Sequence, residues 1–176
     1  MKFYESVQSV AERYAEEINR LRNRESDVAL IGASLGGTIA VEIATYLKVK
    51  CKVIVIDSGT EYKKLRACTF RDHKMNMNQI LKNYAVDDFT KYWMTLNSWD
   101  MLMLLQEYEP TIPTTVEKLY VFSIDGTDLG WNRLMSTSTT KIAGTHEDML
   151  SGKHCHEMAT KIYRILCQTK NESVKD

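Results

Sequence analysis

The sequence predicts an α/β fold with a mainly parallel sheet, and two features of its patterning support this prediction. Short uninterrupted apolar runs recur along the chain, and such runs are typical of strands that are buried on both faces of a parallel sheet. The runs are separated by longer segments in which apolar residues repeat at helical spacing. Strands that alternate with helices in this way are connected as β-α-β units, whose strands run parallel.

The first third of the chain predicts a helix, a strand, a turn, a second helix and a second strand. The helix at the start carries one apolar stripe, whereas the strands are short continuous apolar runs. The predicted ranges are 4–22 (helix), 28–31 (strand), 32–37 (turn), 38–47 (helix) and 53–56 (strand).

The remainder of the chain begins with a segment of different character. Residues 60–108 contain no proline and are rich in methionine, tyrosine and tryptophan, and we predict several short helices there. Two further strands and an amphipathic helix follow this segment. They are predicted at 119–124 (strand), 139–143 (a weaker strand) and 154–168 (helix), with a turn at 125–128 and a loop at 144–153.

The composition favours one domain without a nucleic-acid or membrane partner. The 176 residues suffice for one substantial core, so residues 1–176 are predicted to form a single domain. Basic and acidic residues each total 23, which does not suggest the basic excess of a nucleic-acid-binding protein. No apolar run reaches the roughly 20 residues that span a bilayer, and residues 1–24 lack the apolar core of a signal peptide. We therefore expect a cytoplasmic protein.

The sharpest motif is Gly32-Ala33-Ser34-Leu35-Gly36, which lies between a predicted strand and a predicted helix. A G-x-S-x-G sequence in this context predicts a nucleophile elbow, a strained turn that exposes the serine hydroxyl. The backbone N–H of Leu35, at the start of the helix, then points toward a developing oxyanion. The motif predicts Ser34 as a nucleophile and Leu35 as an oxyanion-hole donor. The alternative is a glycine-rich turn that only packs tightly or binds a phosphate.

A serine nucleophile needs a base, and His146 is the best placed of the four histidines. It follows the last predicted strand and precedes the last helix, where the chain order Ser, acid, His places the base. His73 lies in the helical segment. His154 and His156 are two residues apart and do not share a helix face, and no matching ligand cluster accompanies them, so we expect no metal. A polar loop histidine is the alternative interpretation of His146.

Three aspartates compete for the role of the acid that orients the base. Asp57 ends the predicted strand after the elbow, Asp125 ends the next strand, and Asp128 follows shortly. All lie at the same edge of a parallel sheet as Ser34. Each of them could instead cap backbone N–H groups of its own turn. The residues alone leave these alternatives open.

Three motifs together resemble the thioesterase domains of non-ribosomal peptide, polyketide and fatty-acid synthases, which belong to the α/β-hydrolase superfamily. The resembling segments are 32–44 (GASLGGTIAVEIA), 55–58 (VIDS) and 144–150 (GTHEDML). In that family the elbow helix reads Gly-Gly, then small or apolar residues, then Glu and Ala, and the base lies in Gly-x-His before Met-Leu. The resemblance covers residues 27–166. It implies a partial α/β-hydrolase fold in which residues 60–112 form a helical lid insertion.

The resemblance also implies an activity and an assignment of the acid. Assembly-line thioesterases usually carry the acid after the strand that follows the elbow, which favours Asp57; many other α/β hydrolases carry it near the positions of Asp125 or Asp128. The implied activity is the release of an acyl or peptidyl chain from the phosphopantetheine thioester of a carrier protein. Release proceeds through an acyl-serine and ends in hydrolysis or cyclisation, without a metal or bound cofactor of the enzyme. The alternatives are a free-standing carboxylesterase or lipase with the same triad and a non-catalytic interaction module.

One departure from the family concerns the start of the fold. Family members carry several strands before the elbow, and those strands hold the loop that donates the second oxyanion N–H, whereas Ser34 follows a single predicted helix here. Losing one such donor costs about a hundred- to a thousandfold in rate. We therefore expect the remaining part of the domain, or a second copy of the chain, to act as a partner beside the carrier protein.

Overall fold

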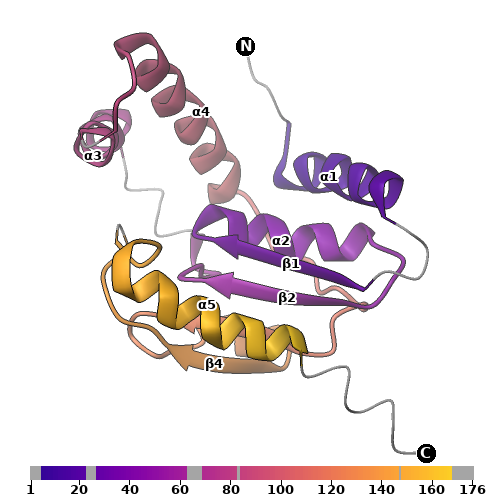
Figure 1. The fold of residues 1–176 in the computed structure, drawn as a ribbon. Coiled ribbons are helices and arrows are strands. Elements are labelled where there is room, and N and C mark those ends of the chain that lie inside the picture. Colours follow the sequence, from indigo (N-terminus) through magenta and orange to yellow (C-terminus); the bar gives the residue numbers. More distant parts are fainter. Residues whose placement is uncertain (1–4, 23–26, 63–68, 83, 147, 168–176) are drawn as a thin grey trace, which may run out of the picture. The chain divides into compact units, whose positions relative to one another are not determined.

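The computed structural model describes residues 5–22, 27–62, 69–82, 84–146 and 148–167. Helices flank a sheet of four parallel strands (Figure 1), and the predicted α/β class is confirmed. The described residues fall into two compact units. A sheet unit comprises residues 11–60 and 110–176, and a helical unit comprises residues 1–10 and 61–109.

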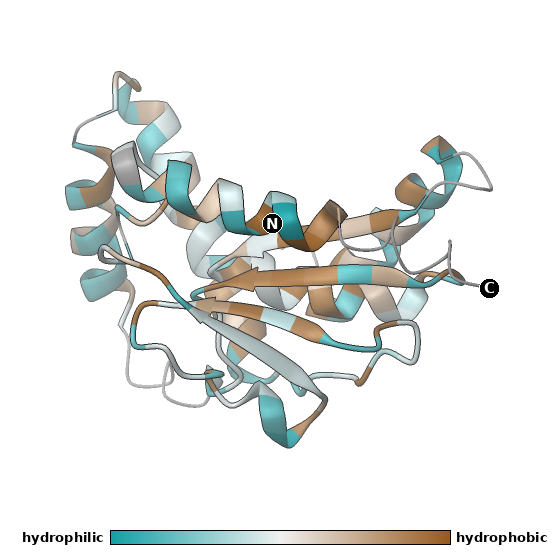
Figure 2. Cartoon of the chain, turned by 60° about the horizontal axis from the view of Figure 1, so that its bottom comes forward, coloured by the Kyte–Doolittle hydropathy of each residue, from teal (hydrophilic) through white to brown (hydrophobic). Residues whose placement is uncertain are grey.

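The strands of the sheet unit follow one another in space in the same order as in the sequence. They are β1 (Val28–Ala33), β2 (Cys51–Ile56), β3 (Leu119–Ser123) and β4 (Thr137–Lys141), in the order β1-β2-β3-β4 and all parallel. The fourth strand begins and ends two residues before the predicted 139–143. Because its residues are polar and mostly β-branched, they show little of the hydrophobic pattern that marks the inner strands, and the contrast is visible in Figure 2.

Helices cover both faces of this sheet. They are α1 (Val7–Leu21), α2 (Leu35–Tyr46) and α5 (Gly152–Cys167), with a short 3₁₀ helix η2 (Trp131–Arg133) between β3 and β4. One face of β2 and β3 packs with α2 and part of α1 around Val53 and Val121, and the other packs with α5 around Ile54 and Phe122. Since alternate residues of the inner strands enter two different cores, both strands are mostly apolar, with Lys52 in β2 and Ser123 in β3 as polar exceptions.

The two edges of the sheet differ in chemistry. At β1, Ala29 is exposed and Ile31 is 47% exposed, although the strand carries no charged side chain. At β4 the strand reads Thr-Ser-Thr-Thr-Lys. A polar edge is suited to water, whereas an apolar edge strand is prone to pair with another strand. The contrast makes β1 the edge of the described sheet that would gain most from a further strand.

The helical unit contains α3 (Phe70–Leu81) and α4 (Asp88–Gln106). The expectation of several short helices is wrong for α4, which has 19 residues and lacks a helix breaker. Its start is set by Asp87, whose carboxylate accepts the N–H of Thr90 at 2.9 Å. A hydrogen bond of 2.8 Å between His73 Nε2 and Ser98 Oγ joins the two helices. The role of residues 60–112 as a lid stays a prediction.

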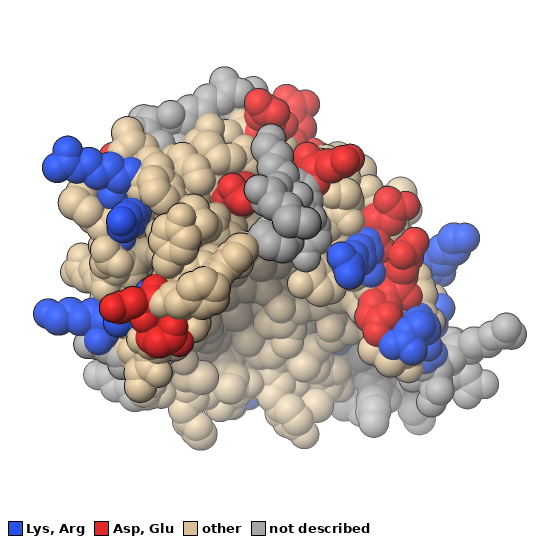
Figure 3. Space-filling model, turned by 90° about the horizontal axis from the view of Figure 1, so that it is seen from above, with Lys and Arg blue, Asp and Glu red and all other residues tan. Residues whose placement is uncertain are grey.

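The surface of the described residues mixes both signs of charge. On the face shown in Figure 3, acidic and basic side chains lie near one another without forming an extended basic surface. Within the described parts of the chain, no helix combines the length and apolar character needed to cross a membrane.

Candidate active site

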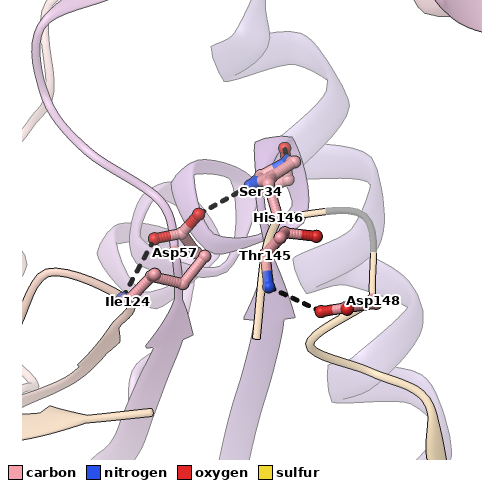
Figure 4. Close-up of polar contacts among 6 residues, drawn as sticks. All are labelled: Ser34, Asp57, Ile124, Thr145, His146 and Asp148. Atoms are coloured by element: carbon pink, nitrogen blue, oxygen red, sulfur yellow. Dashed lines mark hydrogen bonds and ion pairs between the residues drawn. The ribbon is translucent and has the colours of Figure 1, made fainter. Parts of the chain in front are cut away.

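The parallel register of the sheet brings the candidate residues to one edge. Ala33 pairs with Ile56, and Ile56 pairs with Phe122. Ser34 and Asp57 are the next residues after β1 and β2, so they emerge side by side at the carboxyl ends of neighbouring strands (Figure 4).

Ser34 forms the whole connection between β1 and α2. The predicted turn of 32–37 is wrong in its extent, because β1 continues to Ala33 and α2 begins at Leu35. Ser34 has φ 51° and ψ −128°, a conformation that is costly for a non-glycine residue and persists only where its surroundings impose it. Its N–H donates to the carbonyl of Ile56 at 2.8 Å, and its own carbonyl accepts the N–H of Gly37 at 3.0 Å. These contacts fix the turn and leave the hydroxyl free of a capping role.

Two glycines around this turn are required by close packing. A Cβ on Gly32 would lie 2.0 Å from the carbonyl oxygen of Gly36, and a Cβ on Gly37 would lie 2.5 Å from the Cβ of Ser58. A Cβ on Gly36 would meet nothing within 4 Å. Of the two motif glycines, Gly32 is therefore required for space and Gly36 is not, and the second crowded position is Gly37.

His146 links Ser34 to Asp57. Its Nε2 lies 3.0 Å from Ser34 Oγ, and its Nδ1 lies 2.7 Å from Asp57 Oδ2 (Figure 4). The His146 side chain is 47% exposed and that of Asp57 is 17% exposed. The three side chains form a continuous chain of hydrogen bonds in which a serine hydroxyl, an imidazole and a carboxylate follow one another.

The loop that carries His146 is held by a residue that the sequence patterns did not single out. The carboxylate of Asp148 accepts the N–H of Thr145 (Figure 4). The N–H of Met149 donates to the carbonyl of Thr145 at 2.9 Å. Gly144 begins the loop with φ 102°, a value that favours glycine. The spacing Thr-x-x-Asp is the signal that could have indicated Asp148, because a short acidic side chain often caps backbone donors three residues away.

The carboxylate of Asp57 divides its two oxygens between the backbone and the imidazole. Oδ1 accepts the N–H of Ile124 at 3.5 Å, and Oδ2 faces His146. The backbone of Asp57 is unusual as well, with φ 46°. Its N–H donates to the carbonyl of Phe122 at 2.7 Å. Strand β3 therefore supports the N–H of Asp57, and Ile124, the residue after this strand, supports its carboxylate.

Asp125 and Asp128 use their carboxylates within their own turn. Oδ1 of Asp125 accepts the N–H and the hydroxyl of Thr127 at 2.9 and 2.8 Å, and these hydrogen bonds, the backbone one first, lower the pKa of Asp125. Oδ1 of Asp128 accepts the N–H of Gly130 at 2.8 Å. The structure thus brings Asp57 to His146 and gives the two competing aspartates the capping role that was their alternative.

The remaining positions considered in the sequence, Leu35, His154 and His156, lie at the starts of helices α2 and α5. Leu35 is the first residue of α2, where a backbone N–H has no acceptor four residues earlier in the helix; its part in an oxyanion hole stays a prediction. His154 and His156 lie in the first turns of α5. Among the described residues, no group of three or more His, Cys, Asp and Glu side chains could hold a metal ion.

Comparisons with known proteins identify the fold. No family model matches the sequence, and no curated protein matches it. Among solved structures, the chain is similar to the NocB thioesterase domain in covalent complex with a fluorophosphonate nocardicin G analog (TM-score 0.70, 18% identity, 93% of this chain and 76% of that chain). It is also similar to the thioesterase domain SrfTE, described for the cyclization of the lipopeptide antibiotic surfactin (TM-score 0.67, 19% identity, 89% and 74%).

The same fold is found within a larger enzyme. A four-domain nonribosomal peptide synthetase bound to AMP and glycine matches with a TM-score of 0.66 and 13% identity, over 91% of this chain and 16% of that chain. These similarities confirm the predicted α/β fold with a mainly parallel sheet and show that thioesterase domains share it. The identities are low, so the activity of this chain has to be argued from its own residues.

Proposed function

We propose that this chain is a serine thioesterase in which Ser34, His146 and Asp57 act as a catalytic triad. The observation that carries the proposal is the chain of hydrogen bonds from Ser34 Oγ through His146 to Asp57 Oδ2, at 3.0 and 2.7 Å. A serine hydroxyl is a weak nucleophile until a base takes its proton, and an imidazole held by a carboxylate is a base of this kind. The similarity to thioesterase domains supports a thioester as the substrate.

The proposed reaction begins with attack of Ser34 Oγ on the thioester carbonyl. His146 Nε2 takes the hydroxyl proton, and the N–H of Leu35 stabilises the oxyanion together with the positive end of the α2 dipole. The C–S bond then breaks, and His146 returns the proton to the thiol that leaves. Water, or an amine or hydroxyl of the bound chain, attacks the acyl-serine with His146 again as the base. The ester bond to Ser34 Oγ then breaks, and His146 returns the proton to that oxygen. Asp57 keeps the Nδ1–H tautomer of the imidazole and stabilises its positive form.

We infer that the substrate is an acyl or peptidyl chain on the phosphopantetheine arm of a carrier protein. The occurrence of this fold within a four-domain synthetase supports this inference. The helical unit exposes large apolar side chains, among them Met75, Phe89 and Tyr92, and a surface of this kind is suited to an apolar chain. We assign no individual residue of that unit to substrate binding.

A second oxyanion donor is part of the proposal. We propose that it is supplied by a further segment of the domain, or by a second copy of the chain, which pairs along β1. The exposed Ile31 on a strand without charges supports this role for β1, since an unprotected apolar edge favours strand addition. Strand β1 also ends directly before Ser34, so a segment paired along it would approach the nucleophile.

The proposal is tested by the mass of the intact chain after incubation with an acyl-pantetheine thioester. We expect an adduct of one acyl group on the wild-type chain and none on Ser34→Ala. The matched control is Ser98→Ala, because Ser98 Oγ also lies within hydrogen-bond distance of a histidine ring nitrogen, 2.8 Å from His73 Nε2, but its hydroxyl donates to the carbonyl of Thr95 in α4 and not to the ring. Ser98→Ala should acylate as the wild type does.

The other outcomes point to the alternative functions. Faster turnover of simple esters than of pantetheine thioesters would indicate a carboxylesterase with the same triad. A well-folded wild-type chain that gains no adduct from a thioester or a fluorophosphonate would contradict the catalytic proposal and favour a non-catalytic module.

A further inference from the structure

Trp131 is a buried side chain that the proposed reaction does not use. It is the first residue of η2 and is 0% exposed. Its indole Nε1–H donates to the backbone carbonyl of Ser58 at 2.7 Å. A buried indole N–H needs a partner in any fold, but this partner belongs to the residue directly after Asp57. The contact therefore joins the connection between β3 and β4 to the turn that carries the proposed acid.

The turn after β2 needs such support because its backbone is strained. Asp57 has φ 46° although it is not a glycine, and a residue in this conformation stays there only when neighbouring contacts impose it. On one side, the N–H of Asp57 donates to the carbonyl of Phe122 at 2.7 Å. On the other side, Trp131 holds the carbonyl of Ser58, and the N–H of Thr60 donates to the carbonyl of Leu129 at 3.1 Å. Two of these restraints come from residues 129–131.

Helix α2 closes the remaining side of this turn. The hydroxyls of Ser58 and Thr38 lie 3.3 Å apart, and both side chains are buried. Gly37 leaves no space for a Cβ against Ser58. The turn thus lies between the first turn of α2 and residues 129–131. The hydrogen bond from the indole N–H of Trp131 to the carbonyl of Ser58 adds a directional interaction to this packing.

The segment that delivers the indole is itself built to a fixed shape. Oδ1 of Asp128 accepts the N–H of Gly130 at 2.8 Å, and the carbonyl of Asp128 accepts the N–H of Trp131 at 3.1 Å. Gly130 has φ 89°, and a Cβ there would lie 2.4 Å from Thr60 Oγ1. Asp128, one of the aspartates that compete for the role of the acid, therefore starts the short helix that places Trp131 against Ser58.

We propose that Trp131 is a positioning residue for Asp57, acting through the carbonyl of Ser58; the inference rests on the proposed function. Without the indole N–H, the Ser58–Gly59 peptide is free to rotate and the backbone of Asp57 relaxes toward negative φ. Oδ2 of Asp57 then moves from Nδ1 of His146, and the imidazole loses the partner that fixes its tautomer.

The test compares Trp131→Phe, which keeps an aromatic ring but removes the donor, with Leu47→Ala. Leu47 is 2% exposed in the same core as Trp131, so its truncation leaves a cavity without touching the Ser58 turn. For Trp131→Phe we expect kcat on a small acyl-pantetheine thioester to fall about ten- to a hundredfold, with KM within about twofold, because misplaced catalytic groups cost rate rather than binding. Leu47→Ala should lower stability and leave kcat per folded molecule unchanged.

A second readout is the tautomer of His146, measured by ¹⁵N NMR of the neutral imidazole. We expect the share of the Nδ1–H tautomer to fall in Trp131→Phe and to stay at its wild-type level in Leu47→Ala. This measurement does not require turnover, so it tests Trp131 even if the wild-type chain cleaves no thioester, and a failure of the proposed function is thereby distinguished from a failure of this inference. Unchanged kcat and tautomer in Trp131→Phe would overturn the positioning role.

A second replacement guards against misfolding of the phenylalanine variant. Benzothienylalanine in place of Trp131 has nearly the same shape as tryptophan, with sulfur where the indole N–H was. The same fall in kcat and in the Nδ1–H share is expected from it. A folded protein with wild-type values would show that Trp131 serves only the core.

Discussion

The turns after β2 and after β3 lie at the same edge of the sheet and both contain aspartate, yet they use it in different ways. In the turn after β2, Asp57 holds a strained backbone and directs Oδ2 to His146. In the turn after β3, Asp125 and Asp128 direct their carboxylates to backbone N–H groups two residues ahead, those of Thr127 and Gly130.

This difference explains why one of three chemically equal aspartates, Asp57, faces His146 as the candidate acid. All three carboxylates use Oδ1 to accept a backbone N–H, and what sets Asp57 apart from the other two is that its Oδ2 faces the imidazole of His146. Positive φ angles occur in both turns. After β3 they fall on Gly126 (φ 80°) and Leu129 (φ 53°), whereas after β2 the positive φ falls on Asp57 (φ 46°), whose side chain faces the imidazole. A glycine at position 57 would adopt this positive φ without strain, but it would remove the carboxylate that faces His146. The strained backbone of Asp57 is therefore what a functional side chain requires here.

The largest effect that would sharpen this comparison is expected from Asp57→Asn. The amide has nearly the same shape, so the fold should persist, but it cannot hold the Nδ1–H tautomer of His146 as a carboxylate does. We expect kcat for thioester cleavage to fall by about 10³- to 10⁴-fold, as for the equivalent change in a serine-protease triad. Steady-state kinetics with circular dichroism as the folding control measures it. A loss below tenfold would remove Asp57 from the role of the acid.

The next largest effects are expected from adding a methyl group to each turn. Gly37→Ala crowds the turn after β2, and Gly126→Ala is the matched change in the turn after β3. A Cβ at Gly37 would lie 2.5 Å from that of Ser58, whereas a Cβ at Gly126 would meet only Lys141, at 3.5 Å and beyond. We expect Gly37→Ala to lower the free energy of unfolding by about 1–3 kcal/mol through overpacking and to lower kcat, because it pushes on the Asp57 turn. Gly126→Ala should cost about 1–2 kcal/mol through its positive φ and leave kcat unchanged.

Denaturant unfolding and kinetics on the same samples separate these two effects. The decisive quantity is kcat per folded molecule, since both variants lose stability. An equal loss of kcat in both variants would show that the turns are not different in function.

The sheet and the order of its elements could be predicted because their signals are local. Continuous apolar runs identified β1, β2 and β3, and helical periodicity identified α2 and α5. The polar strand β4 was predicted two residues too late, because the apolar Ile142 and Ala143 drew the prediction toward them. In the structure Ile142 lies just after the strand, donating its N–H to the carbonyl of Ser123 at 2.9 Å and packing in the core against α5.

The candidate site could be predicted only as far as chain order defines it. The order of Ser34 and His146 along the chain, each next to a strand, identified both residues. The choice of Asp57 over Asp125 from the residues alone was not possible, because it depends on β2 lying next to β1 and on which carboxylate reaches the imidazole of His146. The role of Gly37 and the contact of Trp131 with Ser58 depend on tertiary packing between segments that are 21 and 73 residues apart.

A smaller effect is expected from Asp128→Ala, which removes the acceptor for the N–H of Gly130. The loss of this hydrogen bond should lower the free energy of unfolding by about 0.5–1.5 kcal/mol. A few-fold loss of kcat should accompany it, because η2 places Trp131 less firmly. Asp128→Asn should lose less of both, since the amide oxygen can still accept the bond. If Asp128→Ala lowered kcat as far as Asp57→Asn does, the proposed division between the two turns would be wrong.

The smallest effect is expected from Asp125→Asn, the matched control for Asp57→Asn. Hydrogen bonds from Thr127 lower the pKa of Asp125, so its ionised form is the one that the folded chain favours. This contribution to stability is present above the unfolded pKa and is lost as the pH falls through the lowered folded value. The wild type should therefore be slightly more stable than Asp125→Asn at neutral pH, and the difference should vanish in acid, while kcat stays within about twofold. Urea unfolding across the acidic range measures the first expectation, and a large loss of kcat in this variant would return Asp125 to the competition for the role of the acid.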